Sequence, residues 1–243
     1  MNRALDLAAT ASRKANRNSI SFMQKSAGLG PSTAKDFIPE LASNRMVAKP
    51  SLPQDQALVF DLGKKRFVVI GFDQMKHYTA RLASRILHDR GKPSAIVYVQ
   101  RGGMVIARLL SDALGVRELH GISASYYTRS NMPSSKLRIG TIPRVSSEGY
   151  LLLVDDIADT GKTLSAIAQS VRRKDRSDLV ICTFGMKPKS IIRPDYYAFT
   201  VSNSTWVIFD YEEHETRRNF ARTGNRSGMR FMDKRFGPAH GQD

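Results

Sequence analysis

The feature that most restricts the fold is a regular alternation of short apolar runs and amphipathic segments between residues 72 and 184. β-Branched and aliphatic residues fill three runs: SAIVYVQ (94–100), YLLLV (150–154) and DLVICTF (178–184). Such runs are typical of buried parallel strands. In the segments before and between them, apolar residues recur at helical spacing. Helices are therefore predicted over the ranges 73–91, 101–115 and 162–173.

Strands that alternate with helices of about 10 to 15 residues indicate right-handed crossovers and a mainly parallel, twisted sheet flanked by helices. We therefore expect an α/β fold, with residues 58–216 as its domain. Ligands of such sheets bind at the carboxyl ends of the strands. Two unusual stretches stand at that position, QRGG (100–103) and DDIADTGKT (155–163).

The segment DTGKT joins an apolar strand to the following helix, so backbone N–H groups and the helix dipole converge there. Gly161 lets the backbone approach an anion closely, and the Thr160 and Thr163 hydroxyls add donors. A phosphate suits this site. Asp155 and Asp156, just upstream, cannot contact that phosphate, whereas sugar hydroxyls or a hydrated divalent cation suit them. A phosphorylated ribose offers both kinds of group.

Two other interpretations of this stretch are weaker. The GKT triplet resembles the end of the P-loop of nucleotide hydrolases, but the glycine required five residues before Gly161 is Asp156. A solvated acidic turn does not explain why two aspartates directly follow a buried strand and precede a phosphate loop.

Length and composition set further bounds. The 243 residues suit one domain with extensions. The sequence contains no run of about 18 apolar residues, so no membrane span is predicted. Cys182 is the only cysteine, which excludes an internal disulfide, so we expect a reducing, cytoplasmic location. The net charge of +16 favours anionic partners, either phosphorylated small molecules or nucleic acid.

Basic segments flank the domain on both sides. Residues 1–57 contain many chain breakers and indicate a basic extension; an organelle-targeting peptide is the alternative, although Asp6 is atypical of one. Residues 217–243 hold seven Lys or Arg against two acids and predict a solvated basic tail that includes Arg217 and Arg218. Contact of these two arginines with pyrophosphate is the alternative. Salt-dependent binding of both segments to nucleic acid is one hypothesis, and a role in an oligomer interface is another.

Several stretches carry a family resemblance. LLLVDDIADTGKTL (151–164) resembles the phosphoribosyl pyrophosphate signature of type I phosphoribosyltransferases. VQRGGMVIARLLSDALG (99–115) resembles the pyrophosphate loop of that family and its following helix. GMKPKSIIRPDYYAFTV (185–201) and STWVIFDYEE (204–213) resemble the base-binding hood of the 6-oxopurine branch, above all its bacterial xanthine-guanine members. The likeness covers about residues 72–212.

The resemblance implies the type I phosphoribosyltransferase fold, with a small hood at about residues 186–215 and a flexible active-site loop. It also implies an Mg²⁺-dependent reaction in purine salvage. Ribose 5-phosphate passes from phosphoribosyl pyrophosphate to a nitrogen of a 6-oxopurine base, and pyrophosphate leaves. The expected partners are thus phosphoribosyl pyrophosphate and a purine base, and we also expect a homo-oligomer.

The resemblance assigns the phosphoribosyl pyrophosphate site residue by residue. Asp155 and Asp156 would hold the ribose hydroxyls, and Asp159 would face N7 of the base as general acid/base. Asp156 and Glu212 would contact the metal, with Asp210 as the alternative to Glu212. The 5′-phosphate would lie against Asp159, Thr160, Gly161, Lys162 and Thr163.

Pyrophosphate is expected at Arg101 and Gly102, whose connecting peptide bond is cis in the family. A long polar stretch, residues 123–149, matches the flexible loop of the family, and Ser125 and Tyr126 match its Ser-Tyr pair. Such a loop excludes water from the site. A disordered linker is the alternative for this stretch.

The base site follows from the same resemblance. Lys187, or Lys189 in its place, would donate to O6 of the purine, a contact that the amino group of adenine cannot accept. Trp206 would stack on the purine, although composition alone fits a core role for it, and the Val207 carbonyl would contact the Watson–Crick edge. The order among guanine, xanthine and hypoxanthine stays open.

Two functional classes remain. One is a purine phosphoribosyltransferase, and the other is a regulator of the same fold that senses phosphoribosyl pyrophosphate and binds nucleic acid. Regulators often lose the catalytic aspartate or the base-binding lysine and aromatic residue. Because this chain has Asp159, Lys187 and Trp206, the enzyme is favoured.

Overall fold

The computed structural model describes residues 58–62, 65–127, 136–143, 145, 149–174 and 178–238. The predicted N-terminal extension, residues 1–57, lies outside them. Among the described helices, none is long and apolar enough to cross a membrane.

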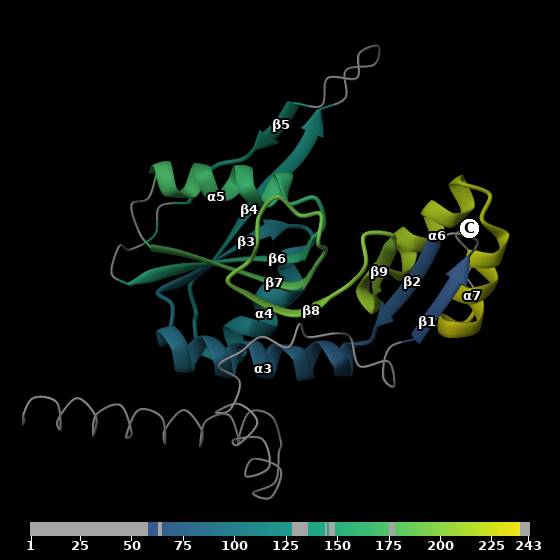
Figure 1. Cartoon of the computed structure of the whole chain (residues 1–243), viewed down its shortest axis with the longest axis horizontal. Coiled ribbons are helices and arrows are strands. Elements are labelled where there is room, and N and C mark those ends of the chain that lie inside the picture. Colours follow the sequence, from purple (N-terminus) through teal and green to yellow (C-terminus); the bar gives the residue numbers. More distant parts are fainter. Residues whose placement is uncertain are drawn as a thin grey trace, which may run out of the picture.

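A six-stranded sheet forms the centre of the molecule, in the order β5-β4-β3-β6-β7-β8 (Figure 1). Its strands pair in parallel except β4 with β5. The predicted strands are confirmed as β3, β6 and β7. The bounds are β3 Ala95–Gln100, β4 Leu119–Tyr127, β5 Lys136–Ile139, β6 Tyr150–Ala158, β7 Asp178–Met186 and β8 Tyr196–Thr200.

The predicted helices are also confirmed, and they cover both faces of this sheet. On one face lie α3 (Phe72–Arg90) and α4 (Gly103–Leu114), and on the other lies α5 (Lys162–Lys174), as Figure 1 shows. Within β6, Leu152 packs in the core cluster of α3 and α4, whereas Leu153 packs in that of α5. A parallel strand buried on both faces must be apolar throughout, which explains the run YLLLV.

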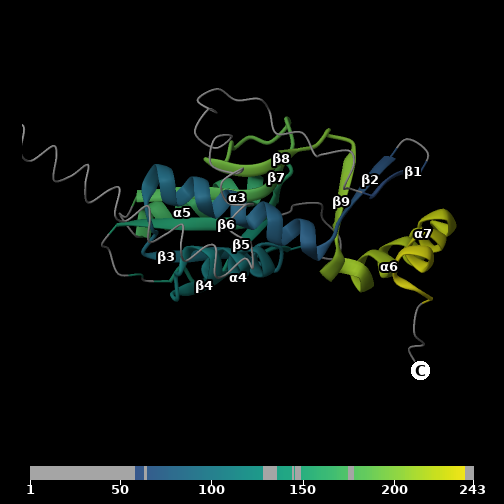
Figure 2. The same ribbon diagram turned by 90° about the horizontal axis from the view of Figure 1, so that it is seen from below.

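A small lobe is built on a second sheet, ordered β1-β2-β9, at one end of the molecule (Figure 2). The bounds are β1 Leu58–Leu62, β2 Lys65–Ile70, β9 Thr205–Phe209, α6 Glu213–Arg222 and α7 Arg226–Phe236. The two helices cover one face, where Phe67 and Ile208 pack with Phe220 and Met232. The predicted hood range, 186–215, is therefore divided between two sheets, because β8 pairs with β7 and β9 pairs with β2.

The prediction of a solvated basic tail is wrong for Arg217. Arg217 is buried, and its guanidinium group lies 2.9 Å from the Glu213 carboxylate and 2.6 Å from the Asp233 carboxylate. A further bond, 3.0 Å long, goes to the Met232 carbonyl oxygen. The apolar residues of α6 and α7 bury the arginine together with their own face, and the acids on the same helices neutralise its charge. Arg218, in contrast, is exposed as predicted.

The stretch 123–149 is not one continuous loop. β4 extends through Ser125 and Tyr126, which pair in antiparallel register with Arg138 and Leu137 of β5. A hairpin satisfies the backbone N–H and C=O groups of a protruding segment, which a long irregular loop would leave to water. The described residues thus place the predicted Ser-Tyr pair on a strand, while 128–135 lie outside them.

Candidate active site

The acidic pair Asp155–Asp156 lies at the carboxyl end of the central strand β6. Asp155 is buried, and its Oδ1 accepts a hydrogen bond of 3.0 Å from the Asp156 backbone N–H. Burial raises the pKa of Asp155 well above its ordinary value, and the Asp156 carboxylate raises it further. Burial also raises the pKa of Asp156. Two carboxyl groups placed in this way need hydroxyl donors or a cation to stabilise their charge.

The QRGG stretch packs directly against this acidic pair. A Cβ atom on Gly103 would lie 2.4 Å from the Val154 carbonyl oxygen, and one on Gly102 would lie 2.5 Å from Asp156 Oδ2. Only glycine therefore lets the start of α4 approach the strand end this closely.

The predicted position of the cis peptide bond is wrong by one residue. The cis bond joins Gln100 to Arg101, not Arg101 to Gly102. Gly102 already has helical dihedral angles, φ −53° and ψ −51°, because α4 begins at the next residue. The cis bond therefore lies where the chain leaves β3.

The predicted phosphate loop forms the connection from β6 to α5. Gly161 has a φ of 72°, the left-handed region that favours glycine, and α5 begins at Lys162. The Ser165 N–H donates to the Gly161 carbonyl at 2.8 Å, and the Thr160 side-chain oxygen accepts from the Lys162 N–H at 3.5 Å. The backbone thus turns into a helix N-terminus beside the acidic pair, as an anion site requires.

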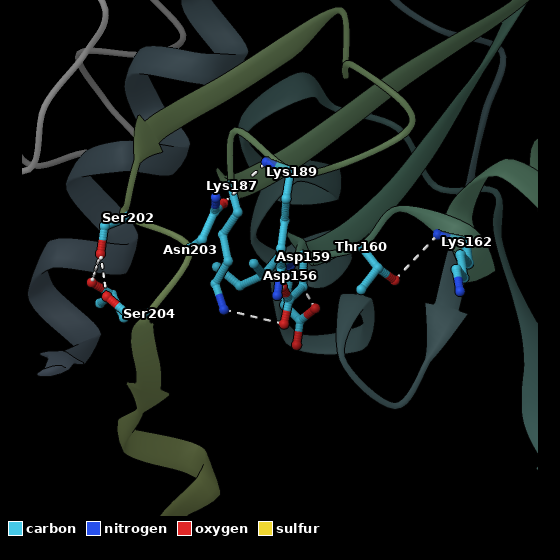
Figure 3. A network of polar contacts seen from close by, with 11 residues as sticks. Asp156, Asp159, Thr160, Lys162, Lys187, Lys189, Ser202, Asn203 and Ser204 are labelled. Carbon is cyan, nitrogen blue, oxygen red and sulfur yellow. Dashed lines mark hydrogen bonds and ion pairs between the residues drawn. The ribbon is translucent and has the colours of Figure 1, made fainter. Parts of the chain in front are cut away.

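Asp159 lies between two lysines (Figure 3). Its carboxylate is 3.1 Å from Lys187 Nζ and 2.8 Å from Lys189 Nζ. Burial alone would raise the pKa of Asp159, but the ammonium groups of Lys189 and Lys187 outweigh it and lower the pKa. Asp159 is therefore a carboxylate at neutral pH, able to accept a proton. Lys187, the predicted base-binding lysine, is buried.

Sequence and structure comparisons then place this geometry in a family. The phosphoribosyl transferase domain model matches residues 72–216. The chain belongs to this family. The match includes both glycine-rich stretches, the acidic pair and both lysines of the site.

Individual phosphoribosyltransferases agree with the family match. The chain is 26% identical to the xanthine-guanine phosphoribosyltransferase of Gluconobacter oxydans over 147 residues, 60% of this chain and 84% of the relative. It is 29% identical to the enzyme of the same name from Cereibacter sphaeroides, over 59% of this chain and 85% of the relative. The structure of a purine phosphoribosyltransferase from Pyrococcus horikoshii superposes with a TM-score of 0.53 at 30% identity, covering 60% of this chain and 93% of the other.

These comparisons confirm two predictions. The chain is similar to type I phosphoribosyltransferases of the 6-oxopurine branch, and its α/β fold is that of the family. The roles of individual residues stay predictions.

Not all predicted site residues of this phosphoribosyltransferase domain come together. Trp206 is 50% exposed and borders a pocket of about 520 Å³ beside α6. The pocket is lined by Arg101, Trp206, Glu212, Glu215, Thr216, Arg218, Asn219 and Arg222, and so by neither Asp159 nor Lys187. Side chains alternate along a strand. Trp206 therefore shares the α6 side of β9 with Ile208, whereas Val207 packs against the core of the six-stranded sheet.

Sequence reasoning missed Tyr211. It lies in a short 3₁₀ helix, η1 (Asp210–Glu212), and its ring stacks on Phe209 with centroids 5.3 Å apart. Its hydroxyl donates to the Gly102 carbonyl at 3.4 Å. Burial raises the pKa of Tyr211, and the nearby charge of Asp156 adds to the effect. The tyrosine therefore ties the small lobe to the glycine-rich turn; the stretch DYEE directly after a strand was the available signal.

Glu212 is also near the acidic pair. Its Oε2 accepts a hydrogen bond of 3.2 Å from the Phe209 N–H, and burial, together with the charge of Asp156, raises its pKa to about 7. Asp210, the alternative hood acid, instead accepts from the Phe72 N–H at 3.2 Å and lies 3.5 Å from Arg235. Of the two acids, Glu212 is thus the one whose pKa is raised by the charge of Asp156 at the end of β6.

The donors fit a magnesium ion only in part. Among the described residues, no group of three or more acidic, histidine or cysteine side chains could hold a metal by itself. Mg²⁺ usually binds to one or two carboxylates and completes its shell with water and substrate phosphates. Asp156 and Glu212, the predicted metal contacts, suit that partial role, because burial raises the pKa of both and the charge of Asp156 acts on Glu212.

Proposed function

We propose that the protein transfers ribose 5-phosphate from phosphoribosyl pyrophosphate to a 6-oxopurine base, with release of pyrophosphate, in purine salvage. The observation that carries the proposal is the juxtaposition of an ionised Asp159, a buried Lys187 and a helix N-terminus beside the acidic pair Asp155–Asp156. The family match and the names of the relatives support the same reaction class.

In this reaction the bond from ribose C1′ to the pyrophosphate oxygen breaks, and a bond from C1′ to a purine nitrogen forms. The protein contributes positioning and charge. Asp155 and Asp156 would hold the ribose hydroxyls, and the loop from Thr160 to Thr163 would bind the 5′-phosphate through backbone N–H groups. Asp159 would exchange a proton with the base: its lowered pKa keeps it a carboxylate, and its partial exposure leaves it open to the base.

The neighbouring residues would bind the pyrophosphate group of the substrate and the metal ion. Arg101 and the Gly102 turn would hold pyrophosphate. Mg²⁺, when bound through Asp156 and Glu212, would neutralise charge on the leaving pyrophosphate. Tyr211 fixes Gly102 from the small lobe, so this lobe and the large sheet would close on the same ligand.

The choice of base would depend on Lys187. A buried ammonium group donates to the 6-oxo group of guanine, xanthine or hypoxanthine but not to the 6-amino group of adenine. Adenine would instead point an amino group at this ammonium group and offer Lys187 no acceptor beyond Asp159, which is unfavourable for a buried charge. Trp206 and the Val207 carbonyl would form the remaining wall, which requires β9 to bring them towards the base.

A base panel tests this proposal. The full chain is incubated with phosphoribosyl pyrophosphate, Mg²⁺ and one of guanine, xanthine, hypoxanthine, adenine, orotate or uracil, and the nucleotide is measured by chromatography. We expect a nucleoside 5′-monophosphate from at least one 6-oxopurine and little or none from adenine. A preference for adenine, orotate or uracil would contradict the proposal.

A further inference from the structure

The two lysines that contact Asp159 are not equivalent. Lys187 Nζ lies at Oδ2 and Lys189 Nζ at Oδ1, so each ammonium group pairs with its own carboxylate oxygen (Figure 3). The Lys187 side chain is 6% exposed, whereas that of Lys189 is 40% exposed. One cation is therefore enclosed in the protein, and the other reaches Asp159 from the edge of the site.

The segment that carries both lysines is fixed over Asp159 by the backbone. The Lys187 N–H donates to the Ala158 carbonyl at 3.0 Å, and the Ile191 N–H donates to the Thr160 carbonyl at 3.0 Å. These two bonds bracket Asp159, the residue between Ala158 and Thr160. The turn after β7 thus cannot move away from Asp159 without breaking two backbone hydrogen bonds.

A second anchor holds Lys189 in particular. Its backbone N–H donates to Asn203 Oδ1 at 3.0 Å, from the turn between β8 and β9. That turn is itself closed, because the Thr205 N–H donates to the Ser202 carbonyl at 3.1 Å and their hydroxyls lie 2.7 Å apart. Figure 3 shows Asn203 beside the backbone of Lys189. The position of the exposed lysine is therefore set by the structure around it.

If the proposed function holds, the ammonium group of Lys187 has two partners. Its ammonium group contacts Asp159, and it would donate to the 6-oxo group of the bound base. When it turns to the base, the hold of Lys187 on Asp159 weakens. With Lys187 as the donor to the base, Lys189 has no contact with the base to make and would keep its own carboxylate oxygen.

We infer that Lys189 is a positioning residue, which holds Asp159 in place and ionised while Lys187 binds the 6-oxo group of the base. The inference rests on the proposed function for the role of Lys187. The charged groups that face Asp159 are the two lysines, from the turn after β7, and Asp156, from its own strand. Loss of a cation favours the protonated carboxyl group, so removing Lys189 raises the pKa of Asp159.

The experiment separates the two lysines in the full-length protein without added substrate. The Asp159 carboxyl carbon is titrated by ¹³C NMR in the wild type, Lys187→Met, Lys189→Met and the double variant, with Asp159→Asn for assignment. We expect the midpoint to stay low in Lys187→Met, because Lys189 remains, and to move to higher pH in the double variant. If Lys187→Met alone shifts the midpoint as far as the double variant does, Lys189 does not keep Asp159 ionised and the inference is overturned.

Turnover of the 6-oxopurine substrate provides the second measurement. Lys189→Met should lower kcat by about 10- to 100-fold, with a smaller change in KM for the base, because Asp159 is displaced. The acid limb of the kcat/KM profile should move to higher pH, and Lys189→Arg should restore both. Lys76→Met, at an exposed lysine on α3, is the matched control and should leave turnover unchanged. If Lys189→Met keeps the kcat and the pH profile of the wild type, the inference is overturned. If the wild type itself has no transferase activity, the proposed function is refuted, and the NMR comparison alone decides on Lys189.

Discussion

The carboxyl end of β6 and the pocket beside α6 present their polar residues in two different ways. At the strand end, Asp155 and Lys187 are buried, and backbone hydrogen bonds on either side of Asp159 fix the turn that carries the lysines. In the α6 pocket, Trp206 is half exposed and Arg101 forms an exposed ion pair with Glu215. The residues of the first region are held by burial and by backbone hydrogen bonds, whereas those of the second lie on the surface between the glycine-rich turn and the small lobe.

The sharpest test of the first region is removal of the proposed proton acceptor, Asp159. Asp159→Asn keeps the shape of the side chain but cannot accept a proton as a carboxylate does, so turnover should fall by roughly 10²–10⁴-fold. Binding of phosphoribosyl pyrophosphate, measured by calorimetry, should stay close to that of the wild type. Asp61→Asn, at an exposed aspartate on β1, is the control. Near-normal turnover in Asp159→Asn would remove this residue from the proton transfer.

The firmness of the small lobe can be tested at Arg217. Arg217→Met leaves Glu213, Asp233 and the Met232 carbonyl without their shared donor and should lower the free energy of unfolding by about 2 kcal/mol, because the arginine is buried while the two acids are partly exposed. Arg218→Met, one residue along and exposed, should change it by less than about 0.5 kcal/mol. Equal effects in urea unfolding would show that the lobe is not held in this way.

The approach of α4 to the strand end can be tested at Gly103. Gly103→Ala places a Cβ against the Val154 carbonyl oxygen in a buried strand, where neither atom can move freely. The free energy of unfolding should fall by about 1–3 kcal/mol, and turnover should fall with it. The control is Met104→Ala, at a half-exposed side chain on the same helix, which should cost less than about 0.5 kcal/mol. A fully stable Gly103→Ala would contradict the close packing.

The smallest expected effect belongs to the α6 pocket. Glu215→Ala breaks an exposed ion pair and should change the free energy of unfolding by less than about 1 kcal/mol. Because it frees Arg101 for pyrophosphate, KM for phosphoribosyl pyrophosphate should fall by up to about fivefold, the equivalent of that energy. A rise in KM would show that Glu215 helps to present Arg101 instead of competing for it.

The same contrast explains what could be predicted from the sequence. Between Leu151 and Thr163 an apolar run, an acidic pair, a glycine and a helix follow one another, so the amino-acid pattern locates the strand and the loop after it. The predicted strand end was wrong by four residues, because β6 continues to Ala158 and includes the acidic pair. Arg217 could not be placed, because its burial depends on Met232 and Asp233 of another helix. The direction of Trp206 depends on the pairing of β9 with β2, which no local pattern determines.

Two finer features, the position of the cis peptide bond and the contact of Lys189, could not be predicted from the sequence for other reasons. The resemblance put the cis peptide bond after Arg101, but Gly102 has helical geometry, which depends on how the chain folds from β3 into α4. The second lysine on Asp159 could be named only as an alternative base donor, because the contact of Lys189 depends on a turn closed from β8 and β9.

The central claim, that the strand-end cluster transfers a phosphoribosyl group to a 6-oxopurine, is tested most directly in a single turnover. Excess protein is mixed with Mg²⁺, limiting phosphoribosyl pyrophosphate and either a 6-oxopurine (guanine, xanthine or hypoxanthine in turn) or adenine, and nucleotide and pyrophosphate are quantified over time. We predict that both products appear together, in equal amounts, with at least one 6-oxopurine, that adenine yields neither, and that Asp159→Asn slows both equally. Pyrophosphate released without nucleotide, nucleotide formed from adenine as fast as from any 6-oxopurine, or no product with any of these bases would contradict the account.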